Sequence, residues 1–171
     1  MKKIIISLCV LAATVMGVNA QKFAMVDMEY IMKNIPSYES ANEQLNQISK
    51  KWQSEVDAQM QEVQKMYKNY QTELVFLSDD MKTKREEEIV TKEKAVQELK
   101  RTYFGPEGEL FKKRQSLMKP IQDEVFTTIQ EISKTKEFDL VFDKSSAMSI
   151  IFTTPKLDIS DQVLQKLGYS K

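Results

Sequence analysis

The chain has 171 residues, of which 29% are charged, with 25 Lys and Arg, 25 Asp and Glu, no histidine and one cysteine, Cys9. The lack of histidine and the single cysteine exclude Ser-His-Asp and Cys-His catalysis and zinc sites built on these ligands. Balanced charge leaves no basic field for nucleic acid, and the phosphate-binding motif Gly-x-x-x-x-Gly-Lys-Ser/Thr does not occur. We therefore expect no enzyme, no cofactor and no metal site.

The first twenty residues are typical of a secretory signal peptide. Lys2 and Lys3 give a basic start, residues 4–16 form a short apolar run, and residues 18–20 offer the small side chains that a signal peptidase reads. A retained membrane anchor is the alternative. Cleavage after Ala20 removes Cys9 and leaves 23 Lys and Arg against 25 Asp and Glu. We expect no stable membrane insertion after cleavage.

A short strand is predicted at residues 22–27, where the sequence reads KFAMVD. Asp27 can cap a short helix over residues 28–34, and Pro36 separates that helix from the next one.

A long helix is predicted from residue 37 to 77, because this range contains no Gly and no Pro. Its apolar positions recur in steps of three and four; they are Ala41, Leu45, Ile48, Trp52, Val56, Met60, Val63, Tyr67, Tyr70, Leu74 and Leu77. The second half follows a regular heptad, whereas the first half carries a stutter. A helix of roughly 60 Å needs a partner helix along its length.

The return helix is predicted to begin after a turn near residues 77–80, where Ser78 can cap it. Its apolar stripe consists of Met81, Ile89, Val96, Leu99 and Tyr103. Arg85 and Lys92 fall on the same stripe, so the seam between the two helices should be thin near the turn. We expect that end of the hairpin to be mobile.

The stretch FGPEGE, residues 104–109, interrupts the return helix. Gly105, Pro106 and Gly108 each disfavour a continuous helix. Counting outward from the turn places this stretch opposite Trp52, so we predict a break there, with Trp52 in contact, that acts as a joint in the arm.

Beyond the break, apolar residues spread over a wider helical face, and strand patterns follow. Strands are predicted at residues 138–143 and 148–153, and a last helix at 161–167. Three short strands make a poor sheet alone, so we expect the sheet to be shared between copies of the chain.

The sequence thus predicts a mostly helical α+β fold. Its parts are a signal peptide at 1–20, a β body at 21–36 and 137–171 for oligomerisation, and a helical hairpin arm at 37–136. The arm projects from the body, turns near 77–80 and breaks near 104–109.

The whole mature chain resembles the Skp (OmpH-type) periplasmic chaperones. The resemblance runs through KFAMVDMEYIMKNIPSY, the hairpin turn LSDDMKTKREEE and FDLVFDKSSAMSIIFTTPKLDISDQVLQKL. Its specific parts are the two ends, whereas the hairpin is a generic coiled coil and adds little specificity. The resemblance implies a periplasmic homotrimer with a small β body, whose helical arms enclose a cavity. Such proteins hold unfolded outer-membrane β-barrel proteins in that cavity without ATP and prevent their aggregation.

The arms of this chain depart from the family in being electrically neutral, whereas many members have basic arms. We therefore favour apolar, multivalent contact with clients over attraction by charge. The candidate client-binding residues lie off the hairpin seam; they are Met66, Val75, Phe76 and Phe104. The alternatives are packing against a neighbouring arm or ordinary exposure.

The apolar residues of the predicted strands are assigned to the core or to the oligomer interface. They are Phe23, Met25, Leu140, Val141, Phe142, Ile150, Ile151 and Phe152. A ligand pocket is the alternative for them. For the whole chain, the alternative function is a structural coiled-coil spacer of the cell envelope, which would not protect a denatured client.

Overall fold

The computed structural model describes residues 21–146 and 150–169. The chain divides into two compact units: a terminal unit of Met1–Ile31 and Thr127–Lys171, and a hairpin unit of Met32–Phe126. The described elements are β1 (Phe23–Val26), α2 (Met28–Lys33), α3 (Pro36–Glu73), η1 (Leu74–Phe76), α4 (Asp79–Phe104), α5 (Glu109–Lys136), β2 (Leu140–Asp143), η2 (Pro155–Leu157) and α6 (Ser160–Lys166). Within this part of the chain, no helix is both long enough and apolar enough to cross a membrane.

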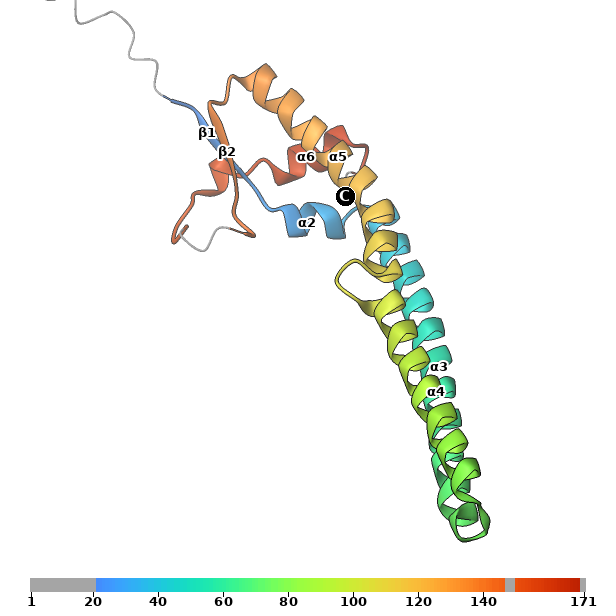
Figure 1. Ribbon diagram of the computed structural model, residues 1–171. Helices are drawn as coiled ribbons and strands as arrows, with labels where there is room; N and C mark the ends of the chain where they lie inside the picture. The colour runs from blue at the N-terminus through green and yellow to red at the C-terminus, as the bar shows by residue number, and fades with distance from the viewer. Residues whose placement is uncertain (1–20, 147–149, 170–171) are drawn as a thin grey trace, which may run out of the picture. The chain divides into compact units, whose positions relative to one another are not determined.

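The hairpin unit is built on α3 and α4, which lie side by side along their length (Figure 1). With 38 residues and no interruption, α3 is about 57 Å long. The single 3₁₀ turn η1 ends it, and the backbone is extended at Leu77 and Ser78. The Ser78 hydroxyl accepts a hydrogen bond from the Met81 amide and so caps α4.

The seam between α3 and α4 is narrow. Its buried cluster consists of Val56, Val63 and Val96, and Leu99 packs against it. The two cations that fall on the predicted stripe of α4 are paired with carboxylates of α3. Lys92 lies 2.9 Å from Glu62, and Arg85 lies 3.9 Å from Glu73. Salt bridges of this exposed kind contribute little stability, so the seam depends on few apolar contacts.

Tyrosines form further links across the seam. The Tyr103 hydroxyl donates to Glu55 over 3.0 Å, and the Tyr70 hydroxyl donates to Glu86. These hydrogen bonds to carboxylates raise the pKa of both phenols, because ionisation would place two negative charges together. The tyrosines fix the two helices in one register while leaving their polar ends in water.

The helix is interrupted over residues 105–108, the place for which the glycines and the proline predict a break. The Gly105 amide donates to the Arg101 carbonyl, and a Cβ on Gly105 would lie 2.4 Å from that same oxygen. A Cβ on Gly108 would lie 2.8 Å from the Tyr103 carbonyl oxygen. Both glycines are therefore required because a Cβ at either position would collide with nearby backbone atoms, and not because the ring of Trp52 needs the space.

Trp52 of α3 lies directly against Tyr103, the next-to-last residue of α4 before this break. Its ring stacks on that of Tyr103, with centroids 4.7 Å apart and an interplanar angle of 5°. The predicted contact of Trp52 is thus made with the last turn of α4.

The terminal unit contains a two-stranded parallel sheet, in which Phe23 pairs with Leu140 and Met25 with Phe142. A parallel pair needs a long crossover connection, and here the whole hairpin unit lies between the two strands in sequence. Ala24 and Val26 are buried on one face. The core of this unit also contains residues from α5 and α6; they are Ile129, Ile132, Val163 and Leu164.

The predicted third strand at 148–153 is wrong for the part that the structure describes. Residues 148 and 149 lie outside the described residues, and residues 150–153 form no strand. An apolar run becomes a strand only where a neighbouring strand accepts its backbone hydrogen bonds, and the described sheet pairs β1 with β2 alone. The domain bounds expected from the sequence, 36/37 and 136/137, stay a prediction.

We expect Gly105→Ala and Gly108→Ala each to lower the free energy of unfolding by about 1–3 kcal/mol, because the added methyl group meets backbone that cannot yield cheaply. Pro106→Ala is the matched control and should change stability by less than about 0.5 kcal/mol, since Pro106 is exposed. Urea unfolding followed by circular dichroism measures the difference. Equal stability of the two alanine variants and the control would contradict the close-approach explanation.

Candidate functional site

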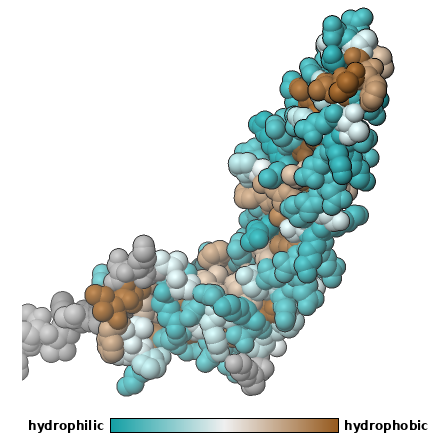
Figure 2. Space-filling model, turned by 90° about the horizontal axis from the view of Figure 1, so that it is seen from below, coloured by the Kyte–Doolittle hydropathy of each residue, from teal (hydrophilic) through white to brown (hydrophobic). Residues whose placement is uncertain are grey.

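The turn of the hairpin carries the most exposed apolar side chains of the hairpin unit. Val75 is 87% exposed and Phe76 is 86% exposed, and Leu74 and Met81 beside them are also exposed. Figure 2 shows apolar atoms gathered at this end of the hairpin. At the turn α3 has ended and α4 has just begun, so these side chains have no helix to pack on. Clustered exposed apolar groups of this kind mark an interaction surface.

Met66, another predicted client-binding residue, lies away from the turn. It is half-buried beside a surface hollow whose other walls are charged, including Lys84, Glu87 and Glu88 of α4. Its surroundings therefore differ from those of Val75 and Phe76.

Phe104, the fourth predicted client-binding residue, is half-buried and packs against the Val56–Val63–Val96 cluster. Its ring meets the edge of Tyr103 at a centroid distance of 6.3 Å. The four predicted residues thus do not form one surface, since only Val75 and Phe76 are brought together. Contact of any of them with a client stays a prediction.

The apolar residues of the predicted strands also divide into groups. Met25 is buried, whereas Phe23, Leu140 and Phe142 are between 38% and 53% exposed. The register places these exposed residues on one face of the sheet, where the Phe23 and Phe142 rings lie 6.4 Å apart. Within one chain, Met25 belongs to the core, and the assignment of the three exposed residues to an oligomer interface stays a prediction.

The remaining members of that group follow the same division. Val141 and Ile150 are half-buried, whereas Ile151 and Phe152 are almost fully exposed. The exposed apolar side chains of the terminal unit thus come from one face of the sheet and from Ile151 and Phe152. Its role in self-association stays a prediction.

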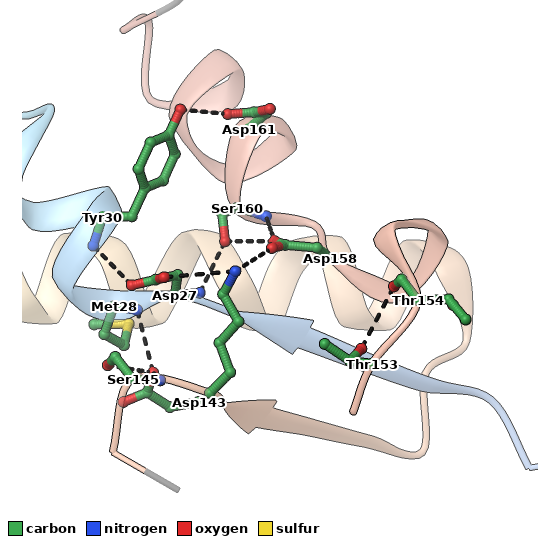
Figure 3. A network of polar contacts seen from close by, with 11 residues as sticks. Asp27, Met28, Tyr30, Asp143, Ser145, Thr153, Thr154, Asp158, Ser160 and Asp161 are labelled. Atoms are coloured by element: carbon green, nitrogen blue, oxygen red, sulfur yellow. Dashed lines mark hydrogen bonds and ion pairs between the residues drawn. The ribbon is translucent and has the colours of Figure 1, made fainter. Parts of the chain in front are cut away.

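A polar network joins the two ends of the chain within the terminal unit (Figure 3). Lys144, which follows β2, lies 2.7 Å from Asp158 and 3.5 Å from Asp27, which follows β1. The hydroxyl of Ser160 donates to Asp158 and accepts a hydrogen bond from the Asp27 amide. Asp143 accepts a hydrogen bond from the Met28 amide. Apart from the hydrogen bond between Ser160 and Asp158, these contacts link residues that are at least 14 positions apart in the sequence.

The network favours the ionised forms of Asp158 and Asp143. Partial burial of Asp158 opposes ionisation, but hydrogen bonds from Lys144 and Ser160 outweigh it and lower the pKa of Asp158. Asp143 has a lowered pKa for a similar reason, since the Met28 amide and Ser145 donate to it against its own desolvation. The hydrogen bond to Asp158 raises the pKa of Lys144. We call this network the clasp; its members are Asp27, Asp143, Lys144, Asp158 and Ser160.

Sequence reasoning assigned Asp27 only a helix cap, and the Tyr30 amide does donate to its carboxylate over 2.9 Å. It assigned no role to Asp143 or Lys144. The available signal was an acidic residue at the end of each strand, since Asp27 follows β1 and Asp143 is the last residue of β2. In the part of the chain described here, no group of three or more His, Cys, Asp or Glu residues is arranged to hold a metal ion.

Comparisons with known proteins gave a family match and a similar solved structure. A family model described as outer membrane protein (OmpH-like) matches residues 22–167. The fold is similar to the crystal structure of a candidate outer membrane chaperone (OmpH-like) from Caulobacter crescentus CB15. The TM-score is 0.69 at 15% sequence identity, and the alignment covers 88% of this chain and 86% of the other. A search of curated protein sequences gave no match.

We expect Asp158→Asn to lower the free energy of unfolding near neutral pH by roughly 2 kcal/mol, because the ammonium group of Lys144 loses its closest charged partner. The pKa of Asp158 is lowered on folding, so its stabilising effect is complete above the unfolded pKa of about 4 and is lost as the pH falls through the folded pKa. The difference in the free energy of unfolding between the wild type and Asp158→Asn should therefore become smaller below about pH 4.

Urea unfolding at pH 7 and at pH 3 measures this gap, and Lys156→Gln at an exposed neighbouring position is the control. A gap that stays constant with pH would show that the ionised carboxylate is not what stabilises the clasp.

Proposed function

The chain belongs to the OmpH-like outer membrane protein family, and on that premise we propose that it is a chaperone of the periplasm. It binds unfolded outer-membrane β-barrel proteins, prevents their aggregation on the way to the outer membrane, and does so without ATP. The family match supports a chaperone role in general terms, and the structural neighbour is itself described as a candidate outer membrane chaperone.

The observation that carries the proposal is the exposed apolar turn of the hairpin. Val75 and Phe76 expose nearly all of their side-chain surface, at the end of a hairpin whose long helix exceeds 50 Å by helix geometry. A folded protein gains nothing in stability from such exposure. A protein that holds unfolded chains needs apolar groups that remain available to them.

The periplasmic location rests on the family and on the first twenty residues, which have the composition of a cleavable signal peptide. Independence from ATP is what the resemblance to the Skp family implies.

Client capture by this chain relies on apolar and multivalent contact rather than on charge. The described carboxylates and cations of the hairpin are extensively paired with each other, as in Lys92–Glu62 and Lys82–Asp79. Weak apolar contacts repeated on several arms reach useful avidity without a tight single site.

Self-association follows from the open face of the sheet. Phe23, Leu140 and Phe142, with Ile151 and Phe152, offer an apolar surface that water disfavours. We place the contacts between copies there, in a homotrimer whose hairpins enclose the client. The break over residues 105–108 serves as a joint that adjusts this enclosure, since its backbone lacks continuous helical hydrogen bonds.

The double variant Val75→Ser, Phe76→Ser should protect a urea-denatured outer-membrane β-barrel protein less well, because each serine removes apolar contact area. Light scattering after dilution of the client measures aggregation. The fold should be unaffected, since both side chains are exposed. Phe111→Ser, at an exposed position on α5, is the control. Unchanged protection would remove the turn from the client surface, and a wild type that gives no protection would favour a spacer.

Phe142→Asp should lower the solution mass toward that of a single chain, because a charge would be buried at the proposed contact between copies. Light scattering coupled to size exclusion, at micromolar protein, gives the mass. Phe111→Asp, which has nearly the same exposure as Phe142, should leave the mass unchanged. A wild type that is already monomeric would overturn the assembly.

A further inference from the structure

One face of α3 is uncharged over its C-terminal half. Met60, Gln64, Tyr67, Gln71 and Leu74 are all exposed and recur in steps of four and three, which places them on one side of the helix. We call these five residues the neutral stripe. In a chain of which 29% is charged, such a run of surface positions without Lys, Arg, Asp or Glu needs a reason.

The neutral stripe exists because α4 covers only one of the two apolar columns of α3. The heptad pattern predicts that Met60, Tyr67 and Leu74 belong to the seam. The structure buries the neighbouring column at Val56 and Val63 and leaves these three residues exposed. These three residues thus keep much of their surface in water at positions that the heptad assigns to the seam, although the hydroxyl of Tyr67 hydrogen-bonds Glu93 of α4.

A hollow of about 340 Å³ lies where the neutral stripe meets α4. Val63 and Val96 of the seam form part of its lining, together with Met60. Gln64 on α3 and Gln97 on α4 also line it. The hollow therefore combines apolar surface with uncharged amide groups on both of its walls.

The chemistry of the hollow suits an uncharged extended peptide. A glutamine amide both donates and accepts hydrogen bonds, as a peptide backbone does, and methionine adapts to apolar side chains of different shape. Glu93 also lines the hollow, but it is engaged by the hydroxyl of Tyr67, a hydrogen bond that raises the pKa of Tyr67. Lys100 adds one positive charge to the lining, so the charges of Glu93 and Lys100 sum to zero.

The other side of the seam gives a contrast within the same hairpin. The hollow beside Met66 is also lined by Thr91 and Ala95, and its other four lining residues are charged; they are Lys84, Glu87, Glu88 and Lys92. An uncharged peptide would have to displace water from these charged groups, which costs free energy without return. The two sides of the hairpin thus differ in charge but present a methionine each.

We propose that the neutral stripe and its hollow bind extended, uncharged client segments in which apolar and polar residues alternate, as they do in the strands of a β-barrel. The proposal rests on the chaperone function proposed above. From Met60 to Leu74 the stripe is about 21 Å long, which matches about six residues of extended chain.

The test uses the full-length mature protein and a synthetic twelve-residue peptide that alternates Phe or Val with Ser or Thr and carries a fluorophore. Met60→Gln removes the methionine of the stripe, and glutamine keeps helix propensity. We expect Met60→Gln to raise the Kd measured by fluorescence anisotropy about three- to tenfold, as partial loss of one buried side chain predicts. Val90→Gln, at a position of α4 with nearly the same exposure as Met60, should leave the Kd within about twofold. Equal effects of the two variants would overturn the proposal.

A crosslinking experiment identifies what occupies the hollow. Cys9 is the only cysteine of the sequence, so Gln64→Cys in the mature protein carries a benzophenone probe at one place. Crosslinking to the peptide from Gln64→Cys, but not from Glu87→Cys on the charged side, supports the proposal. Crosslinking of two copies to each other through Gln64→Cys, with the peptide excluded, would show that a second chain covers the stripe and would overturn it.

Protection of a denatured β-barrel protein separates the two levels of inference. If the wild type protects this client while Met60→Gln binds the peptide normally, the neutral stripe fails and the chaperone function stands. If the wild type fails to protect the client, the chaperone function fails, whatever binds in the hollow.

Discussion

Two helices that pack only on each other can bury one narrow stripe apiece, and the properties of the hairpin follow from this limit. Val56, Val63 and Val96 form the buried cluster of this narrow stripe. Tyrosine–carboxylate hydrogen bonds then fix the register that so thin a seam would leave loose, as at Tyr103 and Glu55. The apolar positions left over remain in water. In most proteins this would be a packing defect, whereas in a protein that binds unfolded chains it provides surface.

The terminal unit solves a different problem, because it must hold together two ends of a chain that a long hairpin separates. A two-stranded sheet is only marginally stable by itself. Here one face of the sheet is buried at Ala24 and Val26, and a clasp of opposite charges closes around Lys144. The other face is apolar and is exposed at Phe23, Leu140 and Phe142. The same small sheet therefore supplies closure within the chain and the surface that is proposed to contact other copies.

Local signals predicted the hairpin well, because they act over a few residues. The capping hydroxyl of Ser78 and the glycines at 105 and 108 mark helix ends in the sequence and in the structure alike. Signals that depend on a distant partner were less informative. Residues 150–153 have strand composition but no strand to pair with, and the heptad could not show that α4 covers one column of α3 and not the other. The clasp was also missed, since no local pattern joins Asp27 to Lys144 and Asp158.

The parallel pairing of β1 with β2 has a consequence for the order of folding. Phe23 can pair only after Leu140 has been synthesised. The hairpin, in contrast, can form outward from its own turn, because each new contact between its helices closes only a short loop. During synthesis, β1 therefore exists for most of the chain's length as an unpaired strand with an apolar face. Even after β2 is made, the clasp stays open until Asp158 arrives. Until its last residues are in place, this protein is itself an incompletely folded chain with an exposed strand edge, the same hazard that it is proposed to relieve in others.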